Sequence, residues 1–216
     1  MEQKKYFDFL QIYRGIAALL VVIHHTYPSF AHFNNLDIPV LAFIAKIGKL
    51  GVDFFFVLSG FIITYTTFKY RGDKSYFKKY AFNRIIRVYI PYLPISLAML
   101  VLYYAFPSIS GSDRSMSLLT SLTLIPHGNP ALSVAWTLIF EMFFYLVFSL
   151  NFFWKKGWIY FLVLWIVGIT VVAVINLELN NPVLKVIFSL YNIEFILGVF
   201  VAYLIKNNFR IKYAHL

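Results

Sequence analysis

The stretch LQIYRGIAALLVVIHHTYPS, residues 10–29, decides the fold class. About 20 mostly apolar residues in helical conformation cross the hydrocarbon core of a bilayer, which is roughly 30 Å thick. Apolar side chains cover most of the surface of this helix instead of forming one stripe, a pattern typical of membrane helices and not of amphipathic helices in soluble domains. The stretch therefore predicts a first transmembrane helix.

Five further stretches have the same character, and they predict an all-α integral membrane protein built as a polytopic bundle of about six transmembrane helices. The composition agrees, because 61% of the residues are hydrophobic and only 13% are charged, whereas soluble domains carry about 25% charged residues. We expect a single domain over residues 1–216. The predicted spans are Leu10–Ser29, Gly51–Phe68, Ile86–Phe106, Leu132–Leu150, Gly157–Ile175 and Val183–Ile205.

The basic residues predict how the chain is oriented in the membrane. In a six-span topology, 15 of the 19 Lys and Arg residues lie on the same side of the membrane as the N-terminus. The four on the opposite side are Lys46, Lys49, Arg114 and Lys185. Positive charge accumulates on the cytoplasmic side of membrane proteins, so we expect both termini to be cytoplasmic. This distribution accounts for the net charge of +10 without nucleic acid, and no DNA- or RNA-binding signature accompanies the charge.

A cleaved signal peptide is the competing interpretation of the first span. Basic residues precede the apolar run, and Ser29-Phe30-Ala31 has the small-x-small form of a cleavage site. Arg14 near the start of the run and the His24-His25 pair near its end count against cleavage.

The chain contains no cysteine, which excludes disulfides and thiolate metal sites, and we expect neither a bound metal nor a bound cofactor.

Ionisable side chains within the spans are the candidate functional residues, because a charge at membrane depth costs a few kcal/mol, roughly, on insertion scales. Arg14 and His25 are eleven residues apart, so on a helix they lie within about 20° of one face and about 16 Å apart along the axis. This spacing suits a long anionic substrate whose reactive end reaches the histidine. The alternative is that Arg14 extends to the interface and His25 makes an interhelical hydrogen bond.

Asp53 and Glu141 are the candidate carboxylates. Asp53 begins the second span at a depth comparable to that of His25, where it either orients the imidazole, as triad carboxylates do, or faces water. Glu141 lies in the middle of the fourth span and is expected to be functional or tightly paired. Glu194 is equally deep but belongs to no constellation that the sequence reveals.

Arg84 and Arg87 open the third span behind a strongly basic loop, residues 69–79. Two arginines at a membrane boundary either grip phosphate groups through paired hydrogen bonds or anchor the helix among anionic headgroups. Soluble-enzyme motifs such as the P-loop and the G-x-S-x-G nucleophile elbow are absent from the sequence.

Four motifs in order resemble those of the acyltransferase 3 family of bacterial integral-membrane O-acyltransferases. They are LQIYRGIAALLVVIHH (10–25), GKLGVDFFFVLSGFIIT (48–64), FNRIIRVYIPYL (82–93) and SVAWTLIFEMFFYLVF (133–148). The stretch from Ser121 to Leu146 is most similar to the branch that modifies exopolysaccharides, and NIEFILGVFVAYL (192–204) resembles a later family helix. Family members continue through further helices, so the chain is expected to represent the N-terminal part of the family core.

The resemblance implies roles for particular residues. The family's arginine and histidine fall on Arg14 and His25, and its arginine-rich helix start falls on Arg84 and Arg87. Its tryptophan motif with a glutamate falls on Trp136, Thr137, Leu138 and Glu141. The arginines would then bind an anionic acyl donor, and His25, Glu141 and Asp53 would form the catalytic set.

The implied activity is transfer of an acyl group, expected to be acetyl, from cytoplasmic acyl-CoA to a hydroxyl of a cell-surface or exported polysaccharide. The implied location is the bacterial inner membrane. His25 would act as general base or carry the acyl group briefly. A transporter component and a non-catalytic truncated membrane subunit are the alternatives, since buried charges also occur in transporters.

Overall fold

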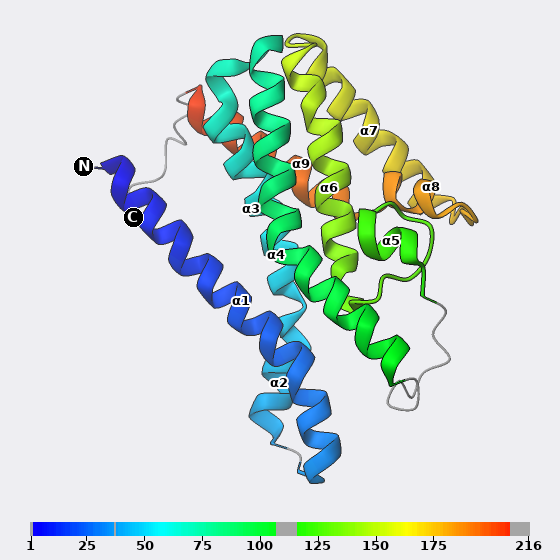
Figure 1. The fold of residues 1–216 in the computed structure, drawn as a ribbon. Helices are drawn as coiled ribbons and strands as arrows, with labels where there is room; N and C mark the ends of the chain where they lie inside the picture. The colour runs from blue at the N-terminus through cyan, green and yellow to red at the C-terminus, as the bar shows by residue number, and fades with distance from the viewer. Residues whose placement is uncertain (1, 37, 107–115, 208–216) are drawn as a thin grey trace. The chain divides into compact units, whose positions relative to one another are not determined.

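The protein is all-helical in the part of the chain that the computed structural model describes, residues 2–36, 38–106 and 116–207. Arg114, one of the cations assigned to the outer side, lies outside those residues. Figure 1 shows the helices in chain order. They are α1 (Glu2–Asn34), α2 (Pro39–Gly48), α3 (Leu50–Thr67), α4 (Phe77–Ala105), α5 (Leu118–Thr123), α6 (Trp136–Phe148), α7 (Gly157–Val174), α8 (Pro182–Ile187) and α9 (Tyr191–Lys206).

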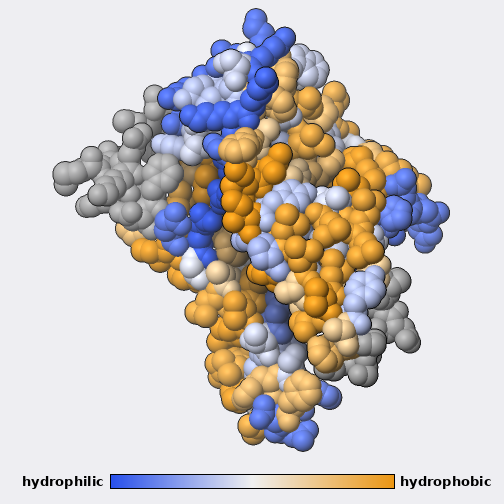
Figure 2. All heavy atoms as spheres, in the orientation of Figure 1, coloured by the Kyte–Doolittle hydropathy of each residue, from blue (hydrophilic) through white to orange (hydrophobic). Residues whose placement is uncertain are grey.

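Five helical segments among the described residues are long and apolar enough to cross a membrane. Five of the spans predicted from the sequence coincide with them, and the remaining one coincides with α3. Figure 2 shows the apolar surface that these segments expose, as expected for helices that face lipid. The segments are Phe9–Asn34, Lys74–Ala105, Ser133–Phe152, Gly157–Val174 and Pro182–Lys206.

The chain divides into two compact units, of which the first combines Met1–Thr64 with Glu194–Leu216. Glycines bring its helices into backbone contact. A Cβ on Gly51 at the start of α3 would lie 2.7 Å from the Ala17 carbonyl oxygen of α1. A Cβ on Gly60 would overlap the Phe195 carbonyl oxygen of α9. Small residues at helix contacts are the usual means of close packing in membranes.

The second unit, Tyr65–Ile193, contains α4 to α8. Helices α4 and α6 are in contact, and Tyr80 of α4 donates a 2.9 Å hydrogen bond to the Tyr145 carbonyl of α6. The aromatic core of this unit includes Phe148, Phe152 and Trp158, all fully buried. The short helix α5 lies between α4 and α6 in the chain and packs on α4, because Ser96 donates a 2.7 Å hydrogen bond to the Ser121 carbonyl.

The sixth predicted span is interrupted between α8 and α9, at residues 188–190. Free carbonyls at a break in a membrane helix must find donors inside the protein. Asn192 donates to the carbonyls of Val186 at 2.6 Å and Ile187 at 3.2 Å, and the Trp165 indole N–H donates to Ile187 at 2.9 Å. The carbonyl groups at the break therefore have hydrogen-bond donors within the protein.

Candidate functional site

His25 is exposed on α1, and its ring is held by its own helix. Its Nδ1 atom lies 2.8 Å from the Val21 carbonyl oxygen, one turn earlier. A carbonyl can only accept a hydrogen bond, so Nδ1 must carry a proton. In the neutral ring the lone pair is then on Nε2, which is the tautomer that a general base needs.

His24, the neighbour of His25, has a different environment. Its Nδ1 atom lies 2.7 Å from the Ala45 carbonyl oxygen of α2, and this contact is partly buried. Gly48 of α2 also packs against Leu20 and His24. His24 therefore joins α1 to α2, whereas the hydrogen bond of His25 stays within α1, and the two rings meet edge to face with centres 5.0 Å apart.

Arg14 and Asp53 belong to the same unit as His25. Arg14 lies on α1, half-buried, with its guanidinium 3.5 Å from Gln11 Oε1. Asp53 is in the first turn of α3, two residues after Gly51, which packs against Ala17 and Val21 of α1. Among the described residues, the partner of His25 Nδ1 is the Val21 carbonyl and not Asp53.

Glu194 is the remaining carboxylate of the first unit among the residues singled out from the sequence. It begins the part of α9 that belongs to this unit, and its Oε2 atom is buried with no hydrogen-bond partner among the described residues. Its carboxyl group and that of Asp53 are close enough to interact electrostatically. Glu194, for which the sequence suggested no partner, therefore has Asp53 as an electrostatic neighbour.

Glu141 and Arg84 lie in the second unit and are connected through one side chain, that of Tyr145. The Tyr145 hydroxyl donates a hydrogen bond to Glu141 Oε1. The guanidinium carbon of Arg84 is 5.3 Å from the centre of the Tyr145 ring, within the range of a cation–π interaction. Tyr145 is 3% exposed, so it positions the two charged groups and is itself shielded from solvent.

Arg87 and the Trp136 motif complete the residues expected from the sequence. Arg87 lies one turn after Arg84 on α4 and is exposed. Trp136 begins α6 and packs at 5.1 Å between ring centres against Tyr191, and Thr137 donates a 3.1 Å hydrogen bond to the Val134 carbonyl. The motif thus shapes the start of the helix that carries Glu141 one turn later.

Tyr145 and Val21 are the two partners that sequence reasoning missed. Tyr145 follows Glu141 by four residues, the helical spacing at which side chains meet, so this signal was present in the sequence. The Val21 carbonyl could not be predicted as a partner from residue type, because every residue has a backbone carbonyl. A histidine four residues later on a helix can nevertheless reach it. In the described part of the chain, no three His, Asp or Glu side chains are grouped to hold a metal ion.

These observations define a multi-pass α-helical membrane protein with a base-competent histidine, arginines on its helices and an internally bonded glutamate. A family model described as an acyltransferase domain matches residues 7–214, and the chain therefore belongs to the acyltransferase 3 family. Searches of curated proteins and of solved structures found no match. The family assignment makes the protein a membrane acyltransferase.

Proposed function

We propose that the protein transfers an acetyl group from cytoplasmic acetyl-CoA to a hydroxyl of a cell-surface or exported polysaccharide, in the bacterial inner membrane with both termini cytoplasmic. The single observation that carries the chemical part is the His25 tautomer, with Nδ1 bonded to the Val21 carbonyl and Nε2 available as a base. The family supplies the reaction class.

In this proposal Nε2 of His25 takes the proton of the acceptor hydroxyl. The hydroxyl oxygen attacks the thioester carbonyl, a C–O bond forms and the C–S bond breaks. The departing sulfur takes the proton back from His25, which leaves an ester and a free thiol. Base catalysis of this kind contributes about 100- to 10,000-fold to a rate.

Arg14, Arg84 and Arg87 would bind the phosphate groups of the donor. Guanidinium groups suit phosphates because they offer paired donors and a permanent charge. Support for Arg84 comes from its environment, because it is half-buried over the rings of Tyr145 and Tyr80. Glu141, bonded to Tyr145, would position or polarise a partner within the bundle, and Asp53 would stabilise the charge that develops on His25.

The test compares the surface glycans of cells that express the chain with those of matched cells that lack it. We expect O-acetyl esters only in the expressing cells. Mass spectrometry detects each ester as a mass increase of roughly 42 Da, because an acetyl group replaces the hydroxyl hydrogen. A different mass increase would show that the donor carries an acyl group other than acetyl. Identical glycans in both cell lines would contradict the proposal that a polysaccharide is the acceptor.

A further inference from the structure

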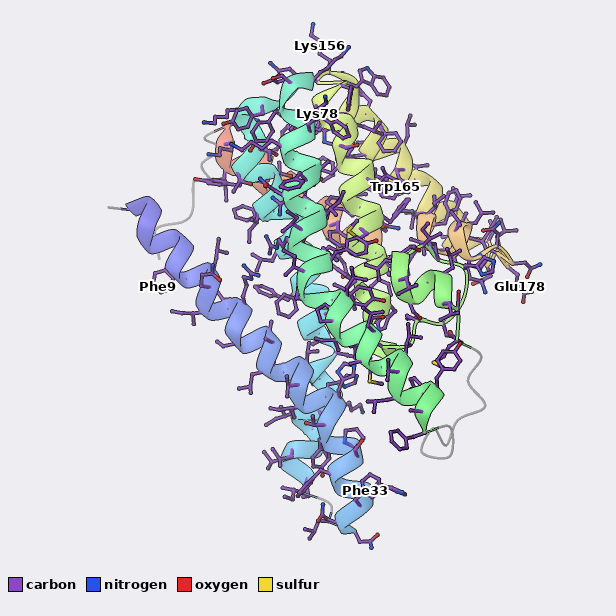
Figure 3. The ribbon with its side chains drawn as sticks, viewed as in Figure 1. Phe9, Phe33, Lys78, Lys156, Trp165 and Glu178 are labelled. Atoms are coloured by element: carbon purple, nitrogen blue, oxygen red, sulfur yellow. The ribbon has the colours of Figure 1, made fainter. Side chains whose placement is uncertain are left out.

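One end of the second unit carries a concentrated set of positive charges. Two segments form it, residues 69–79 before and within the start of α4, and residues 149–156 between α6 and α7. Six exposed lysines, which we call the basic end, project from these segments, and Figure 3 labels two of them at the same end of the unit. They are Lys69, Lys74, Lys78, Lys79, Lys155 and Lys156.

The two segments form one surface because backbone contacts hold them together. The Gly72 N–H donates a 3.0 Å hydrogen bond to the Asn151 carbonyl. Gly72 has φ +78°, which favours glycine, and a Cβ there would lie 3.1 Å from the Lys155 side chain. The lysines of both segments are therefore neighbours in the fold, although about 80 residues separate them in the chain.

Almost no negative charge offsets these lysines. The only acidic residue in the two segments is Asp73. Its carboxylate accepts hydrogen bonds from the Ser75 hydroxyl at 2.6 Å and the Ser75 N–H at 2.9 Å. The Asp73 oxygen is thus engaged within its own turn, and the lysine charges remain available to an external anion.

Aromatic side chains accompany the lysines. Tyr70 and Tyr76 stack with ring centres 3.7 Å apart, and the Lys69 ammonium lies 4.8 Å from the Tyr70 ring centre. Phe153 and Trp154 are about half-exposed beside Lys155. Lysines mixed with exposed aromatic rings at the end of transmembrane helices are typical of a segment that sits among lipid headgroups.

The other end of the second unit provides the contrast. In residues 116–135 and 176–191, Lys185 is the only Lys or Arg residue, and Glu178 is present as well. Figure 3 shows Lys78 and Lys156 at the basic end and Glu178 at the other end of the unit, beside α8. The charge asymmetry along the unit is therefore a property of the folded surface and not only of the sequence.

We propose that the basic end binds the headgroups of anionic phospholipids, with the lysines contacting phosphates and Phe153 and Trp154 entering the acyl-chain boundary. Charge complementarity supports this partner, since basic clusters at the ends of membrane helices bind anionic lipids. A soluble anion would neutralise the lysines but leave both aromatic rings in water, whereas a lipid covers them as well.

The test is tryptophan quenching by brominated lipids in vesicles of phosphatidylcholine mixed with phosphatidylglycerol. Trp154 is the reporter, because it is 55% exposed next to the basic end whereas Trp158 is fully buried. We expect brominated phosphatidylglycerol to quench more strongly than brominated phosphatidylcholine. Replacing Lys155 and Lys156 with Gln should lower the relative association constant for phosphatidylglycerol about 10- to 30-fold.

The matched control is Lys46→Gln with Lys49→Gln, which removes the same charge from exposed positions on and beside α2 in the other unit. We expect this control to keep the wild-type preference. If Lys155 and Lys156 variants do not fold, as judged by helical circular dichroism, Lys78→Gln with Lys79→Gln replaces them. Equal quenching by both lipids in the wild type, or equal losses in variant and control, would overturn the proposal.

A third arm separates lipid from soluble phosphate. Inorganic pyrophosphate added at a constant ionic strength should leave the lipid preference unchanged, because it cannot cover Phe153 and Trp154. Displacement of phosphatidylglycerol by pyrophosphate, at an ionic strength where sodium chloride alone has no effect, would show that the surface takes a soluble anion and would contradict the lipid assignment.

Discussion

Tyr145 donates a hydrogen bond to Glu141 from one turn further along α6. The same phenol ring lies under the Arg84 guanidinium, and the Tyr145 backbone carbonyl accepts a hydrogen bond from Tyr80. One buried tyrosine therefore joins an acid and a base from two membrane helices. Both charged groups are residues that sequence resemblance implied to be functional, so their connection is the feature of this unit that most needs testing.

We expect Tyr145→Phe to lower kcat about 10- to 100-fold, because a hydrogen bond to a charged group contributes about 1.5–3 kcal/mol. The ring and its contact with Arg84 remain in this variant, so KM for the acyl donor should change little. The control is Tyr160→Phe, at a position that is 73% exposed on α7. A Tyr145→Phe enzyme with wild-type kcat would show that the bond to Glu141 serves packing only.

Gly60→Ala and Gly15→Ala should have opposite effects on stability. A Cβ on Gly60 would overlap the Phe195 carbonyl, and such overpacking destabilises by about 1–3 kcal/mol. A Cβ on Gly15 would meet nothing within 4 Å, so alanine should stabilise the helix by up to about 1 kcal/mol. Thermal unfolding in detergent measures both, and a Gly60→Ala protein as stable as the wild type would contradict the α3–α9 contact.

Asn192→Leu should destabilise the break between α8 and α9 by about 1–3 kcal/mol, because buried carbonyls of Val186 and Ile187 lose a donor. Hydrogen exchange of residues 186–192 should rise in the same variant. Asn34→Leu is the control, because Asn34 is exposed and its side chain donates to the Phe30 carbonyl of its own helix. Equal stability losses in the two variants would mean that the break does not depend on Asn192.

The stability of the loop that contains Asp73 should depend on pH. Hydrogen bonds from the Ser75 hydroxyl and then from the Ser75 N–H hold the pKa of Asp73 below the ordinary value of 3.8. A depressed carboxyl pKa stabilises the folded loop above the unfolded pKa, and this contribution is lost as the pH falls through the folded value. The hydrogen-exchange protection of the loop, the ratio of the intrinsic to the observed exchange rate, should therefore be constant between pH 7 and pH 5, roughly, and should fall below about pH 4.

Asp73→Asn is the matching variant, since it cannot titrate. Its loop should keep the same exchange protection across the acidic range. A wild-type loop whose protection falls between neutral pH and about pH 5 would assign the transition to another group, because an Asp with a lowered pKa stays ionised there.

The sequence predicted the helical membrane class because the spans are long and uniformly apolar, and uniform apolarity needs no knowledge of neighbours. It did not predict α2 between the first two spans, since a short helix packed on α1 through Gly48 depends on a tertiary contact. The interruption at residues 188–190 was missed for a similar reason, because one of its hydrogen-bond donors is Trp165 of α7, which lies outside the apolar run, while the other, Asn192, lies within it.

The candidate site divides along similar lines. The placement of Arg14 and His25 on one helix followed from helical geometry alone, and Tyr145 was within reach of the same reasoning from Glu141. The Val21 carbonyl that selects the His25 tautomer is a backbone atom, and no pattern of side chains announces it. The electrostatic link between Asp53 and Glu194 joins residues about 140 positions apart, which only the fold brings together.

The most direct measurement of the central claim is the O-acyl content of surface glycans in cells that express His25→Gln, compared with His32→Gln. Both variants keep α1 polar at the altered position, and His32 is exposed further along the same helix. We expect cells expressing His25→Gln to lose acylation while the protein is inserted at wild-type levels, and cells expressing His32→Gln to keep it. Normal acylation in cells expressing His25→Gln would contradict the assignment of Nε2 as the catalytic base.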